Sequence, residues 1–172
     1  MLRTYLARCW QPFTQLATVV NMDKTSVVPT QAKFWAKYYS GSIQGDANLV
    51  TRPSPYAELV AEEILARSTE ANVTLLEIGC GNGRDAVFFA SQGIKVVATD
   101  ACPAAIAIVT DMLPRNCEAV VAPASSLPVA EVDYAFARFV LHSMDEDEQA
   151  KLFEWVKLHV QNIFYVERSE EH

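Results

Sequence analysis

The chain is poor in basic residues and has no long apolar run. Its 172 residues include 14 basic and 21 acidic ones, which leaves a net charge of −7 and no basic patch. Because binding to a phosphate backbone depends on clustered lysine and arginine, this composition argues against a nucleic-acid partner. No apolar stretch reaches the roughly 20 residues that a membrane-spanning helix needs, so a membrane partner is not expected either.

Cysteine and histidine are also scarce. The four cysteines are widely spaced, with no C-x-x-C pair and no paired histidines, at positions Cys9, Cys80, Cys102 and Cys117. This pattern suggests neither a disulfide framework nor a metal site. We therefore expect no bound metal and a reducing, cytoplasmic location.

From residue 31 the chain alternates between helical and strand patterns. Helices are predicted over 31–41, 54–68, 84–93, 103–113 and 144–160, and strands over 73–79, 95–100, 117–123, 132–139 and 162–168. The rhythm predicts right-handed crossovers and a Rossmann-like α/β fold, with a mostly parallel sheet of about five strands and helices on both faces. The expected organisation is an N-terminal extension over 1–30 and one domain over 31–172.

Glycine is rare, yet three of the six glycines lie within five residues, in the stretch LLEIGCGNGRD over 75–85. A glycine loop between a strand and a helix is typical of a ligand site at the carboxyl edge of a parallel sheet. A dinucleotide fold requires G-x-G-x-x-G, whereas here Arg84 stands where the third glycine would be. Glu77, two residues before the first glycine, would oppose a pyrophosphate and suits a ligand with an ammonium group. This spacing disfavours a nucleotide-dependent oxidoreductase.

An acid also ends the next strand. Asp100 follows Glu77 by 23 residues and closes an otherwise apolar segment. That position suits an acceptor for a ribose diol, and the alternative is an aspartate that caps a helix in a turn.

The stretch LLEIGCGNGRDAVFFASQGIKVVATDAC resembles the first two motifs of class I S-adenosylmethionine-dependent methyltransferases, closely over 75–102 and in element order over 31–168. The resemblance implies S-adenosylmethionine as cofactor, with its methionine part on the glycine turn. It implies that Asp100 accepts hydrogen bonds from both ribose hydroxyls. The full set of cofactor-binding residues that we expect is Tyr39, Glu77, Gly79, Cys80, Gly81, Asn82, Gly83, Arg84, Asp85, Asp100, Ala101, Cys102, Ser125 and Phe136.

Two parts of this set depart from the family or have a second interpretation. Where many relatives present an acid to the adenine amino group, this chain has APASSLP, and we expect the Ala124 backbone and the Ser125 hydroxyl to substitute. Either Gly81 or Gly83 could serve only close packing of a helix against a strand. Phe136 and Phe139 either wall the cofactor or fill the core.

Methyl transfer from a sulfonium is an in-line displacement, so the protein mainly aligns the acceptor and excludes water. The segment FARFVLHSMDED lacks the Asn/Asp-Pro-Pro-aromatic motif of relatives that methylate bases, which favours a small-molecule acceptor. His142 is the candidate general base, or it satisfies backbone groups at the helix entry. Arg138 pairs with an acidic acceptor or bonds local carbonyls.

Both ends of the chain raise further expectations. The aromatic cluster Trp35, Tyr38 and Tyr39 forms a lid over the cofactor or is plain packing. The family usually adds two antiparallel strands after the fifth, and here the C-terminal hairpin is missing, which would leave 162–168 as a bare edge. A shortened gene, a homodimer or cover from the N-terminal residues would account for it. We favour a homodimer, and the alternative function is a catalytically inactive cofactor-binding module that acts through dimerisation.

Overall fold

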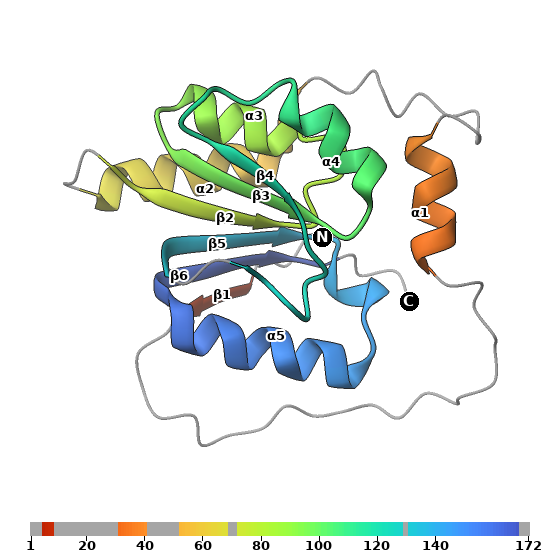
Figure 1. The fold of residues 1–172 in the computed structure, drawn as a ribbon. Helices are drawn as coiled ribbons and strands as arrows, with labels where there is room; N and C mark the ends of the chain where they lie inside the picture. The colour runs from red at the N-terminus through yellow and green to blue at the C-terminus, as the bar shows by residue number, and fades with distance from the viewer. Residues whose placement is uncertain (1–4, 9–30, 41–51, 69–71, 129–130, 169–172) are drawn as a thin grey trace.

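The computed structural model describes residues 5–8, 31–40, 52–68, 72–128 and 131–168. These residues form one twisted sheet with helices on both faces (Figure 1). Its strands are β1 (Tyr5–Arg8), β2 (Thr74–Ile78), β3 (Lys95–Asp100), β4 (Glu118–Val121), β5 (Val132–Arg138) and β6 (Val160–Glu167). The helices are α1 (Gln31–Tyr39), α2 (Pro55–Arg67), α3 (Arg84–Ser91), α4 (Pro103–Thr110), the 3-10 turn η1 (Leu141–Ser143) and α5 (Glu146–His159).

The sheet has the order β1-β6-β5-β2-β3-β4, and the five strands β2 to β6 run parallel. The predicted Rossmann-like α/β fold is therefore confirmed. β2 pairs with β3 on one side and with β5 on the other, so the strand order reverses at β2. Ligands of open parallel sheets bind beyond the carboxyl ends of the strands at such a reversal.

Alternate residues of each strand belong to two separate cores. On β5, Tyr134 and Phe136 pack on the face that α2, α3 and α4 cover, whereas Ala135 and Ala137 pack on the face of α5. Figure 1 shows these helices on opposite sides of the sheet. Burial on both faces explains why the strands are continuously apolar rather than alternating.

Helix boundaries follow the expected capping chemistry. The Ser54 hydroxyl accepts a hydrogen bond from the Ala57 amide at 3.1 Å and begins α2. Asp145 and Glu148 form a capping box at the start of α5, with each side chain accepting from the other's backbone amide.

The edge of β6 is paired. β1 runs antiparallel to it, from Tyr5 opposite Val166 to Arg8 opposite Ile163. Of the three expected explanations, the structure shows cover by N-terminal residues. Because β6 is paired, a bare edge is no longer an argument for a homodimer. β1 lies within the predicted extension 1–30, whose other residues lie outside the described part of the chain. No strand follows β6 among the described residues.

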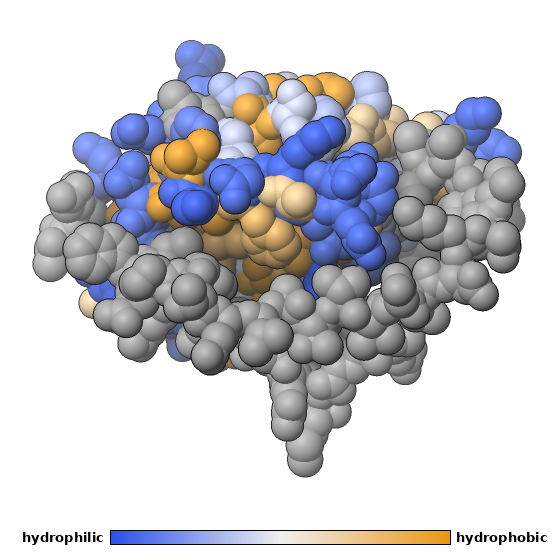
Figure 2. Space-filling view, turned by 90° about the horizontal axis from the view of Figure 1, so that it is seen from below, coloured by the Kyte–Doolittle hydropathy of each residue, from blue (hydrophilic) through white to orange (hydrophobic). Residues whose placement is uncertain are grey.

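α5 is the lowest helix in Figure 1. Figure 2 shows that hydrophilic side chains cover much of the described surface seen from below, with apolar atoms between them. α5 buries Leu152 and Val156 and exposes Phe153 and Leu158. Among the described residues, no helix is long and apolar enough to cross a membrane.

Candidate functional site

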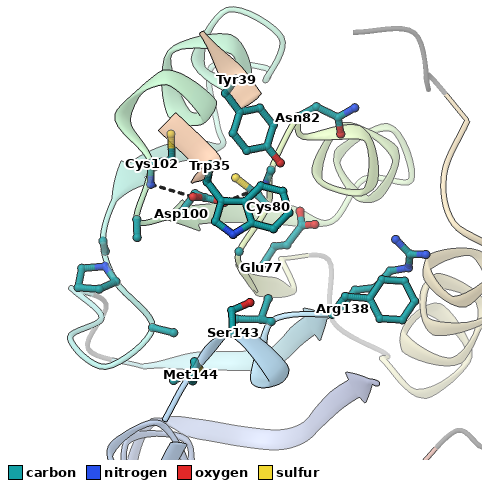
Figure 3. Close-up of a pocket in the computed structure, with 18 of the residues that line it drawn as sticks. Trp35, Tyr39, Glu77, Cys80, Asn82, Asp100, Cys102, Arg138, Ser143 and Met144 are labelled. Atoms are coloured by element: carbon teal, nitrogen blue, oxygen red, sulfur yellow. Dashed lines mark hydrogen bonds between the residues drawn. The ribbon is translucent and has the colours of Figure 1, made fainter. Parts of the chain in front are cut away.

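A cavity of about 520 Å³ lies at the carboxyl ends of β2, β3 and β5, where the strand order reverses. α1 borders it on one side, and η1 with the start of α5 borders it on another (Figure 3). Most residues predicted to bind the cofactor line it: Tyr39, Glu77, Gly79, Cys80, Gly81, Asn82, Arg84, Asp85, Asp100, Ala101, Cys102 and Ser125. The structure therefore brings together residues from four separate segments of the sequence.

The three loop glycines all have a positive φ, but they serve different purposes. At Gly81 an added Cβ would lie 2.5 Å from the Tyr39 hydroxyl, beside the cavity. At Gly83 it would lie 2.6 Å from Cγ2 of Val109, a fully buried residue of α4. Gly83 is itself buried and does not line the cavity, so its role is close packing of the loop against α4.

The amides of the glycine loop are engaged within the protein. Those of Gly79 and Cys80 both donate to the carbonyl of Thr99, at 2.8 and 2.9 Å, and that of Gly83 donates to the carbonyl of Cys80. The Gly81 amide donates to Asp100 Oδ2 at 3.0 Å. A phosphate cradle needs free amides at this position, and these four are not free.

Asp100 bridges the two loops that follow β2 and β3. Its Oδ2 accepts from the Gly81 amide, and its Oδ1 accepts from the Cys102 amide at 2.8 Å. These bonds fix the orientation of the carboxylate at the cavity wall (Figure 3). Each oxygen keeps a further lone pair with which to accept a hydroxyl of a ligand.

Glu77 is the most unusual group at the site. It is 4% exposed, and its Oε2 has no hydrogen-bond partner. Burial, reinforced by the negative charge of Asp85, raises the pKa of Glu77 well above its ordinary value. Its carboxylate points into the cavity (Figure 3). An unpaired buried carboxylate costs free energy unless a cationic donor satisfies it.

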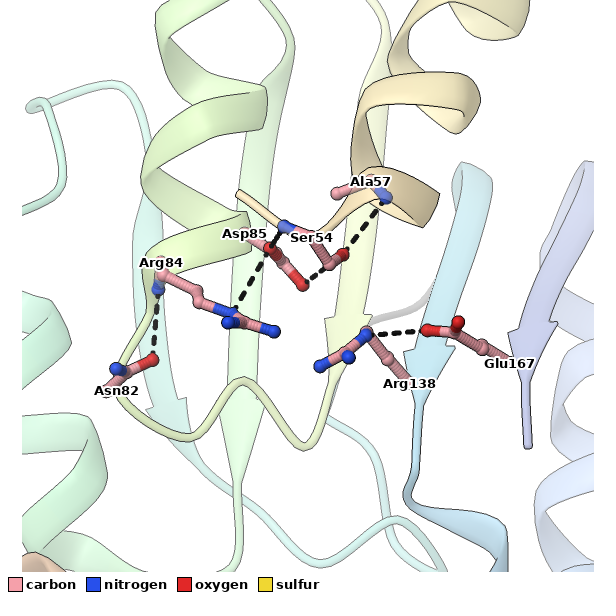
Figure 4. A network of polar contacts seen from close by, with 7 residues as sticks. All are labelled: Ser54, Ala57, Asn82, Arg84, Asp85, Arg138 and Glu167. Atoms are coloured by element: carbon pink, nitrogen blue, oxygen red, sulfur yellow. Dashed lines mark hydrogen bonds and ion pairs between the residues drawn. The ribbon is translucent and has the colours of Figure 1, made fainter. Parts of the chain in front are cut away.

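Asp85 has a structural partner. Its Oδ1 accepts from the Ser54 amide at 2.7 Å, and its Oδ2 accepts from the Ser54 hydroxyl at 2.9 Å (Figure 4). Asp85 thereby ties the first turn of α3 to the start of α2. The Arg84 guanidinium lies 3.6 Å from the same carboxylate, with Nε facing Oδ1.

Arg138 lies at the end of β5, and its side chain pairs with a carboxylate of the chain. Its Nε donates to Glu167 Oε2 at 2.6 Å, and its guanidinium lies 4.1 Å from the centre of the Phe139 ring. Arg138 lines the cavity, so its predicted position beside the ligand is consistent with the structure, but a carboxylate of the chain already partners it.

The three aromatic residues of the predicted lid lie on α1. Trp35, Tyr38 and Tyr39 all line the cavity, and the rings of Trp35 and Tyr39 stack with centroids 6.0 Å apart. Burial and the nearby Asp100 raise the pKa of Tyr39, so its hydroxyl remains protonated at neutral pH. Burial also raises the pKa of Cys80, which makes this residue a neutral wall rather than a thiolate nucleophile.

Two further predicted residues lie away from the cavity. Phe136 is fully buried, with ring centroids 5.5 Å from Tyr56 and 5.1 Å from Phe89, because the alternation of β5 turns it into the core under α2 and α3. His142 is exposed on η1 and does not line the cavity, because that turn directs Leu141 inward instead.

The structure also adds residues that the sequence analysis did not include. They line the cavity from the ends of β4 and β5 and from the entry to α5: Ala122, Pro123, Val140, Ser143, Met144 and Glu148. Of these, only Glu148 is marked by a sequence pattern, because its spacing from Asp145 is that of a capping box. Val140 becomes recognisable only in three dimensions, because its side chain fills the space beside Gly79.

The comparisons with known proteins agree with this geometry. A family model described as a methyltransferase domain matches residues 75–162, just over half of the chain. The chain belongs to this family. The match confirms the resemblance to S-adenosylmethionine-dependent methyltransferases, and S-adenosylmethionine is the cofactor of the family. No curated protein matches this methyltransferase.

Solved structures match its fold. One, from work on the conversion of a disulfide bond into a thioacetal group during echinomycin biosynthesis, has a TM-score of 0.61 and 20% identity and covers 76% of this chain. The methyltransferase spans 56% of that protein, little more than half of its length. A TehB-like methyltransferase from Corynebacterium glutamicum has a TM-score of 0.58 and 20% identity over 81% of this chain and 73% of its own. Magnesium protoporphyrin IX methyltransferase from Synechocystis PCC 6803, with bound S-adenosylmethionine, has a TM-score of 0.59 and 13% identity over 78% and 74%.

The residues present fit S-adenosylmethionine. Glu77 offers a buried carboxylate oxygen that lacks a donor, which an ammonium group would satisfy. Gly79 and Gly81 line the cavity, and Asp100 stands beside them as an oriented acceptor.

Proposed function

We propose that this methyltransferase binds S-adenosylmethionine in the cavity and transfers its methyl group to a small-molecule acceptor. The observation that carries the proposal is the buried, unpartnered Glu77 Oε2 beside a glycine loop whose amides are already bonded. This combination disfavours a pyrophosphate and favours a ligand that presents a cation at that point.

Each part of the wall has a distinct task in the proposal. Asp100 accepts the ribose hydroxyls, and Glu77 accepts the ammonium group. Ala101, Cys102 and Ser125 lie beside the adenine. Tyr39 closes the loop side and helps to exclude water. When bound, the cofactor supplies a methyl group already activated by a sulfonium, so these residues need only bind and orient it.

The acceptor site belongs to the opposite wall. Arg138, Phe139, Ser143 and Met144 line the cavity there, and a small molecule can approach the methyl group from that side. The exposed His142 is not required as a general base in this arrangement. An acceptor whose reacting atom carries no proton at neutral pH needs no base at all.

Cofactor binding is tested by calorimetric titration of S-adenosylhomocysteine and of NAD into the purified chain. The proposal predicts one S-adenosylhomocysteine site per chain with micromolar affinity and no heat from NAD. Binding of NAD alone would overturn the assignment of the cavity.

Turnover separates the enzyme from the alternative, a binding module that acts through dimerisation. Release of S-adenosylhomocysteine from S-adenosylmethionine is measured against a panel of small acceptors, with Asp100→Asn, at a cofactor concentration that it does not bind, as the control. Binding with no release against any acceptor would favour the module. The homodimer remains a prediction, and a monomer in light scattering at micromolar concentration would refute it.

A further inference from the structure

Phe139 has a backbone conformation that its side chain disfavours. Its φ is 56°, and it is the only residue other than glycine with a positive φ among the described residues. A bulky residue in this region is strained and persists only where its surroundings hold it. Phe139 lines the cavity directly after β5, so the strain lies at the candidate acceptor wall.

One residue, Glu167, holds this conformation from two directions. Its backbone carbonyl accepts from the Phe139 amide at 2.9 Å. Its side-chain Oε2 accepts from Arg138 Nε at 2.6 Å (Figure 4). The Arg138 guanidinium in turn packs over the Phe139 ring. The pair is well shielded, because the side chains of Arg138 and Glu167 are 25% and 12% exposed.

Residues 139–140 pack against the glycine loop. Val140 follows Phe139 directly, and its side chain occupies the space that a Cβ at Gly79 would need. Both Val140 and Gly79 line the cavity. If Phe139 relaxed to a negative φ, the chain would turn in another direction and Val140 would leave Gly79.

We propose that Glu167 is a positioning residue, which fixes Arg138 and Phe139 so that residues 139–140 form the wall opposite the glycine loop. The inference rests on the proposed function, because this acceptor wall also meets the proposed cofactor loop where Val140 packs beside Gly79. In this inference Arg138 supports the conformation of Phe139 and does not pair with the acceptor.

The test compares Glu167→Gln with Glu63→Gln. Glu63 forms an ion pair with Arg67 at 2.7 Å on α2 and does not line the cavity, so it is a matched control. Glu167→Gln should weaken S-adenosylhomocysteine binding about three- to tenfold at a temperature well below the melting transition. Glu63→Gln should leave the affinity unchanged. A purely stabilising role for Glu167 would lower the melting temperature without moving the affinity, and that result overturns the proposal.

The Phe139→Gly background sharpens the test. Glycine adopts a positive φ without support, so adding Glu167→Gln should there change the affinity less than twofold. An equal loss in both backgrounds would show that Glu167 acts by another route.

A ligand-free readout separates this inference from the proposed function. Hydrogen exchange of the Phe139 amide should accelerate at least tenfold in Glu167→Gln and remain unchanged in Glu63→Gln. If the wild type binds no S-adenosylhomocysteine, the proposed function fails, while this exchange still decides whether Glu167 holds Phe139. Unchanged exchange overturns the positioning role.

Discussion

The two walls of the cavity are built in different ways. The wall at β2 and β3 consists of two short loops that are joined by backbone amides, as the Gly81 amide bonds Asp100 at the start of the next loop. The wall at β5 and β6 depends on the pair Arg138 and Glu167, which are 29 residues apart. The first wall presents the carboxylates of Glu77 and Asp100 to the cofactor. The shape of the second wall depends on the strained residue Phe139. The cofactor side is thus built from the loops of two consecutive strands, whereas the shape of the acceptor side depends on a contact with the last strand, β6.

The largest effect is expected from Asp100→Asn, which removes the charge from the β3 loop with little change in volume. Hydrogen bonds to a charged group contribute about 1.5–3 kcal/mol each, so loss of the two ribose bonds should weaken S-adenosylhomocysteine binding at least about 100-fold. Calorimetry measures the affinity. Asp133→Asn is the control, because Asp133 Oδ2 also accepts a backbone amide, from Thr74 at 2.7 Å, and does not line the cavity. Equal losses in both variants would refute a binding role for Asp100.

Glu77→Gln should be next, with an affinity loss of about 10–100-fold, because the ammonium group loses a charged partner. The same change should make the free protein more stable at neutral pH. Chemical denaturation measures the free energy of unfolding, and a variant that is less stable and binds normally would contradict the assignment.

The stability difference between Glu77→Gln and wild type should depend on pH. The pKa of Glu77 is raised above its ordinary value of 4.5 by burial, so the unfolded chain ionises first as the pH rises. In the wild type, Glu77 makes its full contribution to the free energy of unfolding below pH 4.5. This contribution is lost as the pH rises through the pKa that Glu77 has in the folded protein. The glutamine variant has no such loss, so its advantage grows upward from about pH 4.5, by about 1.4 kcal/mol for each unit of pKa. A difference that is constant with pH would contradict this.

Two glycines should separate binding from packing. Gly83→Ala should destabilise the fold by about 2–4 kcal/mol, because it adds left-handed strain and a clash with the buried Val109. Gly81→Ala should cost about 1–2 kcal/mol, because the Tyr39 hydroxyl can move away. Thermal denaturation and calorimetry together should show the larger stability loss at Gly83 and the larger affinity loss at Gly81. The reverse order would refute the division of roles.

The smallest effects on binding are expected at Phe136 and His142. Phe136→Leu should lower the free energy of unfolding by about 1–2 kcal/mol and change the affinity less than twofold, because the ring lies in the core. His142→Gln should change the free energy of unfolding by less than about 0.5 kcal/mol. A large affinity loss in the Phe136 variant would show that this residue contacts the cofactor after all. Loss of turnover in the His142 variant would support its predicted role as a general base.

The sequence predicted those features that depend on local pattern. The alternation of apolar strands and helices was enough for the Rossmann-like sheet, and the spacing of Gly79 and Gly81 with Glu77 indicated the ligand class. It could not show that Phe136 turns into the core, because a fully buried strand has no polar face to mark its orientation. Val140 and Glu167 were missed because their roles arise only when distant segments meet. The pairing of β1 with β6 was open among three outcomes, since register across a long connection has no local signal.

A crystal structure with S-adenosylhomocysteine tests the central claim most directly, since the claim is that two carboxylates divide the ligand between them. It should place both ribose hydroxyls within about 2.7–3.2 Å of Asp100 and the ligand's amino group within the same range of Glu77 Oε2. A ligand that binds outside the cavity, or inside it with Glu77 still unpartnered, would contradict the account.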